Sequence, residues 1–339
     1  MKRIFITGCT GYIGSHTCVE LLNAGYEIVG LDNFSNSKSD VLNRIKEITG
    51  KDIVFYEGNM LDKTLLEKIF SENDISCVID FAAYKSVGDS VNKPIDYYIN
   101  NVSSVLTLLN VMSNHNVKSL VFSSSATVYG DPEFVPLTEK ARIGGTTNPY
   151  GTSKLFVEKI LEDLYKADNG FKICVFRYFN PVGAHQSGLI GEEPNGIPAN
   201  LMPYVAKVAD GELDHLNIFG NDYDTPDGTG VRDFIHIVDL AKAHVKGVEK
   251  LFKINNGLLI YNLGTGKGYS VLDIVKAFEK VNKVKVPYEI APRREGDIAQ
   301  CYADPSLAEE ELDWKAELSL EDMCRDAYNF QRRRKNEKN

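Results

Sequence analysis

Cysteine, long apolar runs and excess positive charge are all scarce in this sequence, and each shortage excludes a class of protein. The six cysteines among 339 residues form no CxxC pair and the six histidines do not cluster, so we expect neither a disulfide framework nor a metal site. A reducing, cytoplasmic compartment fits this cysteine usage. No segment offers the ~18 apolar residues of a membrane span, and the apolar run at 4–6 is too short for a signal-peptide core.

Positive charge is outnumbered, with 38 lysine and arginine residues against 47 acidic residues and a formal net charge of −9. Nucleic-acid binders usually carry a basic footprint, so we expect no nucleic-acid partner. If the ligand is a small anion, positively charged groups must therefore be placed at its binding site. The balance of 43% apolar and 25% charged residues is that of a folded globular protein, and the length corresponds to about two domains.

Short apolar runs alternate with amphipathic stretches through the first half of the chain. We expect strands at these runs and a first helix over 12–23, the strands being residues 4–7, 27–32, 53–57, 77–83, 120–123 and 172–177. Nearly continuous apolar strands separated by helices indicate a parallel sheet covered on both faces. The predicted fold class is therefore α/β: a Rossmann-type doubly wound parallel sheet with a smaller α/β substrate-binding lobe.

The composition changes after residue 180, where glycine, proline and asparagine dominate residues 181–200. We place a domain boundary there. Residues 1–180 form the predicted nucleotide-binding domain and residues 181–339 the ligand-gripping domain, with part of 232–264 returning to the first. The C-terminal string QRRRKNEKN is highly charged, and we expect it to be a frayed, solvated end.

A glycine-rich turn opens the chain in KRIFITGCTGYIGSH, where Gly8, Gly11 and Gly14 fall between the first expected strand and helix. The first glycine permits a tight turn, the second lets the backbone approach a pyrophosphate, and the third lets the helix pack on the strand. The helix N-terminus adds free N–H groups and the positive end of its dipole. Asp32 ends the second strand, where a carboxylate binds ribose hydroxyls and repels a 2′-phosphate, so the pattern predicts NAD over NADP. A purely structural turn is the alternative.

A serine, a tyrosine and a lysine form the candidate catalytic group. Ser125 follows the fifth expected strand, at the carboxyl edge where parallel sheets place ligands. Asn148 and Pro149 predict a helix start, and Tyr150 and Lys154 then lie on one helical face. A tyrosine titrates near ~10. We expect the Lys154 ammonium and an oxidised nicotinamide to lower that pKa for general-base work, with Ser125 relaying a proton. An exposed tyrosine beside a solvated lysine is the alternative.

The spacing GxxGxxG, in place of GxGxxG, resembles the short-chain dehydrogenase/reductase superfamily. In its extended branch, sugar-nucleotide dehydratases carry an Asp-Glu pair directly after the equivalent serine, because eliminating water needs an acid and a base at adjacent carbons. Ala126 and Thr127 occupy those positions here. We therefore expect hydride transfer without dehydration.

Residues 1–325 as a whole resemble the UDP-glucose 4-epimerase family. The matching strings occur in order along both predicted domains: TGCTGYIGSHT, LDNFSNSK, FSSSATVYGD, NPYGTSK, RYFNPVGAH, NLMPY, FGNDY, DGTGVRDFIH, YNLGTGKG and APRREGD. The resemblance implies a tightly held NAD that is not consumed, and interconversion of UDP-glucose and UDP-galactose in galactose metabolism. It implies that Tyr150 takes the proton of the sugar 4′-hydroxyl while hydride leaves carbon 4. The 4-keto sugar then turns over and regains hydride on its other face.

The resemblance also assigns binding roles, residue by residue. Contacts to NAD fall to the glycine turn, the strand ends and the catalytic group, namely Gly8, Gly11, Tyr12, Ile13, Gly14, Asp32, Asn33, Asn36, Ser37, Asn59, Met60, Phe81, Ala82, Ala83, Lys85, Asn100, Ser123, Tyr150, Lys154 and Tyr178. Contacts to the UDP-sugar fall to both domains, namely Lys85, Ser125, Ala126, Thr127, Tyr150, Phe179, Asn180, Asn200, Leu201, Phe219, Arg232, Arg294, Asp297 and Cys301. Asn59 stands where the family has an aspartate, and an amide still binds adenine. Phe234 replaces a common tyrosine, which we expect to remove a hydrogen bond and leave activity intact.

Cys301 falls at the position beside carbon 2 of the sugar, where narrow-specificity relatives carry a tyrosine. The smaller side chain leaves room for a 2-acetamido group, so we expect UDP-GlcNAc and UDP-GalNAc to be substrates as well. A small buried residue without a gating role is the alternative. The resemblance further implies a homodimer that pairs helices 100–115 and 150–168, although their apolar residues would also suit a monomer's core.

Two other functions stay open on the sequence alone. The first is a net oxidoreductase or a decarboxylase that acts on the same sugar nucleotides. A net oxidoreductase would release NADH. A non-catalytic NAD sensor is the other. A sensor would keep the glycine turn but would not need Tyr150, Lys154 and Ser125 together.

Overall fold

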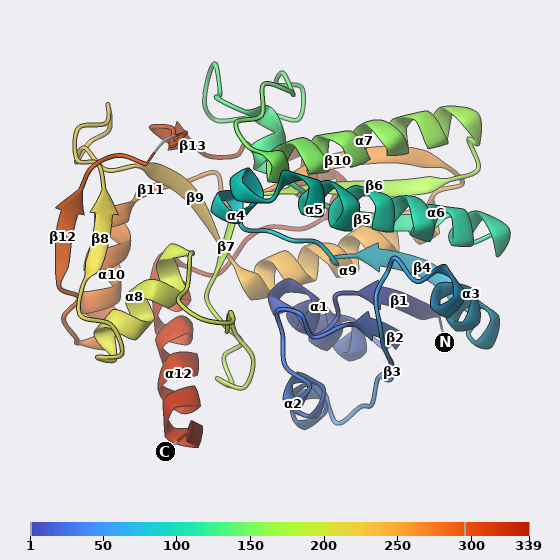
Figure 1. The fold of residues 1–339 in the computed structure, drawn as a ribbon, viewed down its shortest axis with the longest axis horizontal. Helices are drawn as coiled ribbons and strands as arrows, with labels where there is room; N and C mark the ends of the chain where they lie inside the picture. Colours follow the sequence, from blue (N-terminus) through green and yellow to red (C-terminus); the bar gives the residue numbers. More distant parts are fainter. Residues whose placement is uncertain (1, 295, 339) are drawn as a thin grey trace.

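A seven-stranded sheet dominates the first part of the molecule (Figure 1). The computed structural model describes residues 2–294 and 296–338. All strand pairs of this sheet are parallel, in the order β10-β6-β5-β4-β1-β2-β3. The strands are β1 (Arg3–Thr7), β2 (Glu27–Asp32), β3 (Val54–Glu57), β4 (Ile75–Asp80), β5 (Ser119–Ser125), β6 (Lys172–Tyr178) and β10 (Gly257–Leu263). The predicted Rossmann-type parallel sheet is confirmed.

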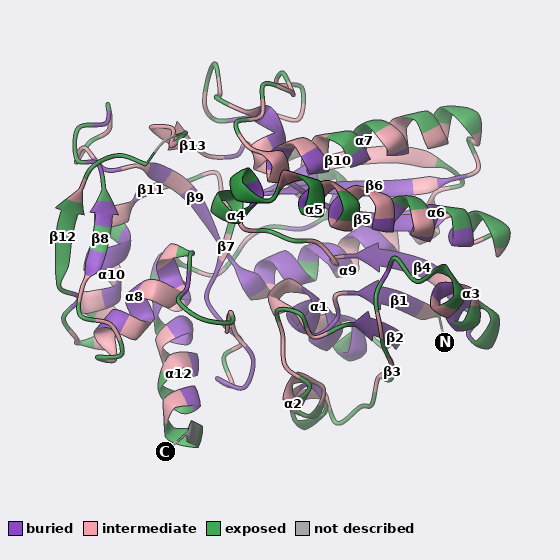
Figure 2. Ribbon diagram, viewed as in Figure 1, coloured by how far each residue is buried: buried purple, intermediate pink, exposed green. Residues whose placement is uncertain are grey.

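Alternate residues of β1 enter two different hydrophobic cores, which explains why its sequence is apolar without interruption. Ile4 and Ile6 belong to the core on one face and Phe5 to the core on the other, and all three are fully buried. Figure 2 shows the same burial along the neighbouring strands. The first face is covered by α1 (Tyr12–Asn23), α2 (Asp40–Thr49), α9 (Ile237–Lys253) and α11 (Ser306–Leu312). The second is covered by α3 (Lys63–Glu72), α6 (Ser104–Asn114) and α7 (Pro149–Ala167).

The strand order reverses between β1 and β4, and this switch point positions the site. Ligands of such sheets bind beyond the carboxyl ends of the strands at the reversal. There the backbone of Gly8, after β1, lies against Ala82, after β4. β4 ends at Asp80, earlier than predicted, because Phe81 and Ala82 turn to donate their N–H groups to the Thr7 hydroxyl (3.2 Å each).

Two smaller sheets form the second lobe. One has the order β11-β9-β13, with β7 also pairing with β9, and the other pairs β8 with β12. Its strands are β7 (Asn180–Val182), β8 (Leu216–Phe219), β9 (Val231–His236), β11 (Gly268–Ser270), β12 (Tyr288–Ala291) and β13 (Gln300–Cys301). The helices α8 (Leu201–Ala209), α10 (Val271–Asn282) and α12 (Leu320–Lys338) share a hydrophobic core with them. The predicted smaller α/β lobe is therefore present.

The C-terminal segment is helical to Lys338, so the expectation of a frayed end is wrong. Arg332 and Arg333 are exposed, as expected of a solvated end, but Arg334 is not. Arg334 is only 9% exposed and forms ion pairs with Glu193 (2.7 Å), Glu337 (2.7 Å) and Asp40 (3.5 Å). Glu193 and Asp40 are distant in sequence, and Glu337 lies on the same helix. Together these carboxylates neutralise the charge of Arg334, which the local sequence alone does not predict.

All six cysteines are free thiols. Among the described helices, none combines the length and the hydrophobicity that crossing a lipid bilayer requires.

Candidate active site

The glycine-rich turn between β1 and α1 fits a pyrophosphate. Gly8 has a φ of 65°, a left-handed conformation that favours glycine, and its N–H donates to the Leu31 carbonyl (2.8 Å). A Cβ on Gly14 would collide with the Gly8 carbonyl oxygen, so only glycine lets α1 begin this close to the strand. Gly11 is the N-cap of α1, and no side chain of the described residues bonds to this helix start. The first N–H groups of α1 therefore remain available to an anion.

Asp32 ends β2 with both carboxylate oxygens oriented by the protein. One oxygen accepts from the Phe34 N–H (2.9 Å) and the Ser37 hydroxyl (3.2 Å), and the other accepts from the Thr10 N–H (3.0 Å). Asp32 also lines the cavity described below. A carboxylate held here has lone pairs left for ribose hydroxyls and repels a phosphate on the 2′-oxygen. The residues present therefore fit NAD.

Lys154 is buried beside the carboxyl end of β5. Its Nζ donates to the Ser123 carbonyl (2.7 Å) and lies 4.9 Å from the centre of the Phe122 ring. Burial lowers the pKa of Lys154 to about 8, while the buried carboxylates Asp80 and Glu158 act to raise it. The side chain thus retains a positive charge at neutral pH within the cavity wall.

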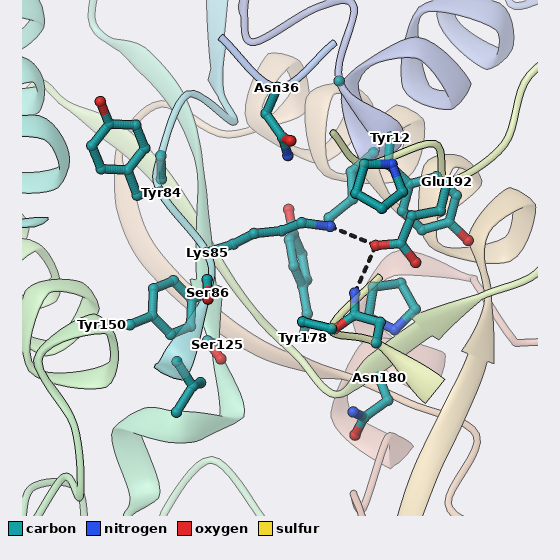
Figure 3. A pocket seen from close by; sticks show the side chains of 18 of the residues that line it. Tyr12, Asn36, Tyr84, Lys85, Ser86, Ser125, Tyr150, Tyr178, Asn180 and Glu192 are labelled. Atoms are coloured by element: carbon teal, nitrogen blue, oxygen red, sulfur yellow. Dashed lines mark hydrogen bonds and ion pairs between the residues drawn. The ribbon is translucent and has the colours of Figure 1, made fainter. Parts of the chain in front are cut away.

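The oxygen of Ser125 accepts two hydrogen bonds from Thr127, so its own proton can be donated to Tyr150. Ser125 ends β5 and caps the short 3₁₀ turn η2 (Ala126–Tyr129). Its hydroxyl oxygen accepts from the Thr127 N–H (3.2 Å) and the Thr127 hydroxyl (3.0 Å). Helix α7 begins as predicted, because the Asn148 side chain accepts from the Gly151 N–H (2.9 Å). Figure 3 shows Ser125 and Tyr150 on the same side of the cavity.

The protein's own groups do not lower the pKa of Tyr150, whereas the prediction counted on Lys154 together with an oxidised nicotinamide. Burial raises this pKa to about 12, and a hydrogen bond with Ser125 acts in the lowering direction. The expected lowering by Lys154 is absent because the ammonium is bonded to the Ser123 carbonyl instead. The protein's own groups therefore do not make Tyr150 a base at neutral pH, and that role requires a further positive charge beside the ring.

Tyr178 lies at the end of β6 and reaches a buried histidine. His244 Nδ1 lies 2.8 Å from the Leu240 carbonyl, so this nitrogen donates and Nε2 accepts. The Tyr178 hydroxyl donates to that Nε2 (2.5 Å). Burial lowers the pKa of His244 to about 4, so the ring is neutral at physiological pH and holds Tyr178 in place.

An ion pair that the sequence analysis missed lies behind the catalytic group. Arg177 and Glu158 are each 2% exposed and share two bonds, of 2.7 and 3.1 Å. The Ser124 hydroxyl donates to Glu158 (2.5 Å), and Arg177 also donates to the Tyr129 hydroxyl (3.0 Å), which donates to Asn262 (2.6 Å). We call Glu158 and Arg177 the buried pair. Its one sequence signal is that Glu158 follows Lys154 by four residues, one helical turn.

Glu192 is a second residue that the sequence analysis missed. One of its carboxylate oxygens accepts from Lys85 (2.7 Å), as Figure 3 shows. The same oxygen accepts from the Asn200 amide (2.6 Å). Glu192 thus joins a residue predicted to contact NAD to one predicted to contact the sugar nucleotide. Nothing in the loop sequence GEEPNG indicates that its first glutamate meets Lys85, 107 residues earlier.

The arginines predicted to grip an anion share one carboxylate. Arg294 donates to Asp297 (3.1 Å), and Arg232 lies 3.7 Å from the other oxygen of Asp297. The Arg294 guanidinium also lies 4.6 Å from the centre of the Phe219 ring. Two positive charges against one negative charge leave a local excess that suits a pyrophosphate.

Cys301 lies in β13 in register with Arg232 of β9. It is partly buried, and burial raises its pKa to about 11, so the thiol is neutral at physiological pH. Asp233 accepts from the Ala303 N–H (3.1 Å) and from the Thr265 N–H (2.8 Å), which ties the chain that follows β13 to the chain that follows β10. Cys301 itself lines the cavity.

One cavity of about 1040 Å³ joins the glycine turn, the candidate catalytic group, Glu192, the two arginines and Cys301. Every residue that the sequence analysis assigned to catalysis, NAD or UDP-sugar lines it, from the glycine turn through the β5 end to the second-lobe arginines. Ala126 and Thr127 also line it, so the positions where dehydratases carry an acid pair present a methyl group and a hydroxyl.

The sheet, the glycine turn and the switch-point cavity define a Rossmann-type nucleotide-binding α/β enzyme. The sequence profile of the family described as GDP-mannose 4,6 dehydratase matches residues 5–327. The chain is 59% identical to the UDP-glucose 4-epimerase of Haemophilus influenzae over 97% of both chains. It is 53% identical to that of Homo sapiens, over 98% of this chain and 97% of the other.

Solved structures agree with these sequence relatives. The UDP-glucose 4-epimerase of Bifidobacterium longum in complex with NAD+ and UDP matches with a TM-score of 0.96 and 56% identity over 99% of both chains. The UDP-Glc/GlcNAc 4-epimerase of Campylobacter jejuni matches with a TM-score of 0.85 and 34% identity, over 98% of this chain and 100% of the other. The chain belongs to the UDP-glucose 4-epimerase family.

Proposed function

We propose that this chain is an NAD-dependent isomerase that interconverts UDP-glucose and UDP-galactose by inverting the 4′-hydroxyl, with a role in galactose metabolism. The observation that carries the proposal is the single cavity that joins the glycine turn, the catalytic group and the second-lobe arginines. Relatives named UDP-glucose 4-epimerase, and the complex with NAD+ and UDP, support it.

In this proposal, Tyr150 removes the proton of the sugar 4′-hydroxyl and later returns it. NAD supplies a hydride acceptor and a positively charged ring that favours the tyrosine phenolate. Lys154 adds a second positive charge in the cavity wall, and the Ser125 hydroxyl donates its proton to the phenol or to the substrate oxygen. A 4-keto sugar that turns over before it is reduced again accounts for inversion without net redox change.

Residues 1–180 hold NAD and residues 181–339 hold the UDP-sugar in this proposal, with part of 232–264 returning to the first domain. Arg232 and Arg294 bind the UDP pyrophosphate, since guanidinium groups make paired bonds to phosphate oxygens. Six free cysteines support a reducing, cytoplasmic location.

The test is to incubate purified protein with UDP-galactose and no added NAD. Formation of UDP-glucose with no accumulation of NADH supports the epimerase. Stoichiometric NADH would indicate a net oxidoreductase. No product even with NAD supplied would rule out the proposal and leave a non-catalytic NAD-binding protein.

We also propose that UDP-GlcNAc and UDP-GalNAc are substrates. The thiol of Cys301 occupies less of the cavity wall than a tyrosine would, which leaves volume for a 2-acetamido group. A solved relative described as a UDP-Glc/GlcNAc 4-epimerase supports this breadth.

A homodimer is the proposed assembly. The outer face of α5 (Pro94–Tyr98), the π-helical turn η1 (Ile99–Ser103), α6 and α7 exposes Ile95, Ile99, Leu106 and Phe156, which are 67%, 48%, 47% and 47% exposed. Apolar side chains gathered on one face mark an association surface. We expect light scattering to give twice the chain mass of 37.8 kDa for the wild type, and Phe156→Glu to yield monomers. A monomeric wild type would contradict the proposal.

A further inference from the structure

A segment of the second lobe, residues 184–200, crosses to the first lobe and lies on the loop predicted to hold the adenosine ribose; we call this segment the strap. Glu193 pairs with Lys38 (2.6 Å), and the Asn195 side chain donates to the Ser35 carbonyl (3.1 Å). The Asn195 N–H lies 3.4 Å from the Asn36 side-chain oxygen. Strap residues and the predicted ribose contacts line the same cavity.

Helix α12 holds the strap along its length. The Asn329 side chain donates to the Gln186 carbonyl (3.3 Å), and Arg333 donates to the Ser187 carbonyl (3.4 Å). Further along, the Phe330 ring packs directly on Gly191, where any side chain on the strap would collide. The last contact is the ion pair between Arg334 and Glu193 (2.7 Å). The same carboxylate that bonds to the ribose loop through Lys38 is therefore bonded to α12.

Helix α2 closes the other side of this arrangement. Arg44 of α2 donates to the Leu189 carbonyl of the strap (2.8 Å) and pairs with Glu337 of α12 (2.6 Å). Arg334 also reaches Asp40 at the start of α2 (3.5 Å). Figure 1 shows α12 and α2 descending on either side of the connection that follows β7. The strap is thus enclosed between a helix of each lobe.

The charges in this cluster persist at neutral pH. Burial alone would raise the pKa of Glu193, but hydrogen bonds from Lys38 and Arg334 hold it below the usual value. The hydrogen bond from Arg44 likewise lowers the pKa of Glu337 to about 2. Partly buried, networked pairs of this kind hold more firmly than isolated exposed ones.

We propose that Arg334 is a positioning residue for the cofactor: through Glu193 it pins the strap on the ribose loop and so sets how long NAD remains bound. The inference rests on the proposed function, because it requires that Asn33, Asn36 and Ser37 hold the adenosine ribose. Release of that end then requires the strap to lift, and lifting requires the Glu193 contacts to break.

The experiment compares the dissociation of labelled NAD from wild type and Arg334→Ala, chased with excess unlabelled NAD. We expect release from Arg334→Ala to be about fivefold to tenfold faster, the effect of losing a firm ion pair. Arg332→Ala is the matched control. Arg332 is exposed on the same helix, lies 5.9 Å from the Tyr328 ring, and should leave the release rate unchanged.

Salt distinguishes a charge contact from general loosening of the fold. Salt should accelerate release from the wild type more than release from Arg334→Ala, because screening weakens the Arg334 pair that the variant lacks, while the Lys38–Glu193 pair is present in both. Glu193→Gln should also speed release, and the double variant should release NAD no faster than the faster single variant. Arg334→Lys keeps the positive charge but loses the guanidinium group, so its NAD release rate should fall between those of wild type and Arg334→Ala. The same variant provides the test if Arg334→Ala does not fold.

If NAD-loaded Arg334→Ala releases NAD at the same rate as the wild type, this inference alone is overturned. The same holds if the effects of the two substitutions on the release rate add up in the double variant. A wild-type protein that neither contains NAD after purification nor takes it up would overturn the proposed function together with it.

Discussion

The candidate catalytic group and the arginines proposed to bind the UDP pyrophosphate share one cavity but are held in opposite ways. Lys154 extends from a helix to a strand carbonyl, with the buried pair behind it. Arg232 and Arg294 instead share Asp297, and the Arg294 side chain is 56% exposed. Where we propose that bonds change, the fold fixes atoms with buried partners. Where we propose that an anion binds, the fold offers two arginines that share one carboxylate, which a bound anion can replace.

The largest effect should come from removing the phenol at the fixed end. Tyr150→Phe should lower kcat for UDP-galactose about 10³-fold, because the proton acceptor is lost. NAD content and thermal unfolding should stay at wild-type values. Tyr288→Phe, at an exposed position of β12, is the control. Turnover within a factor of a few of wild type would remove Tyr150 from the mechanism.

Breaking the buried pair should be the next largest effect. Glu158→Ala leaves the Arg177 guanidinium buried without its carboxylate, and we expect the free energy of unfolding to fall by about 3–5 kcal/mol in urea titrations. A loss below about 1 kcal/mol, the range of exposed pairs, would show that the two ends of the cavity do not differ as described.

The buried lysine should appear as a pH dependence of stability. Its pKa is about 8 in the fold, below the ordinary value, so between these values the unfolded chain binds the extra proton and stability rises with pH. Relative to Lys154→Met, the wild type should gain about 2 kcal/mol of unfolding free energy between about pH 7 and about pH 10. If the difference in unfolding free energy does not change with pH over this range, burial does not lower the pKa of Lys154.

The sugar end should respond through specificity. Cys301→Tyr should lower kcat/KM for UDP-GalNAc at least about tenfold and leave UDP-galactose within about twofold, because the added ring fills the space for the acetamido group. Cys301→Ala should keep both activities. Unchanged N-acetyl activity in the tyrosine variant would discard the gating role.

The smallest effect belongs to an exposed pair on the same helix as Glu158. Glu162 lies 2.9 Å from Lys159, whose side chain is 53% exposed. Glu162→Ala should change the free energy of unfolding by no more than about 0.5 kcal/mol. A loss as large as that of Glu158→Ala would contradict the distinction between buried and exposed pairs.

The parts of the molecule that the sequence predicted depend on local pattern. The first and last residues of β2 and α1 follow from apolar runs and glycine spacing. The position of Tyr150 and Lys154 on one helical face follows from the helix start at Asn148 and Pro149. Each of these signals lies within a few residues of the feature it predicts.

The parts that the sequence did not predict depend on residues brought together by the fold. Glu192 meets Lys85 and Arg334 meets Glu193 across more than a hundred residues, and no local pattern records such a pairing. The share of the protein's own groups in the Tyr150 pKa could not be predicted, for the same reason. It is set by burial and by which oxygen Lys154 reaches, and both are properties of the packed site.

The path of the chain through the large sheet has a consequence for synthesis. β10 is the outer neighbour of β6, yet the chain builds β7, α8, β8, β9 and α9 of both lobes before reaching it. A ribosome must therefore release residue 263 before β6 gains its last partner, and until then a nascent chain carries an open, apolar strand edge. The sheet that binds the nucleotide begins with the first residues translated, yet it is completed only after β7, α8, β8 and β9 of the second lobe have been made.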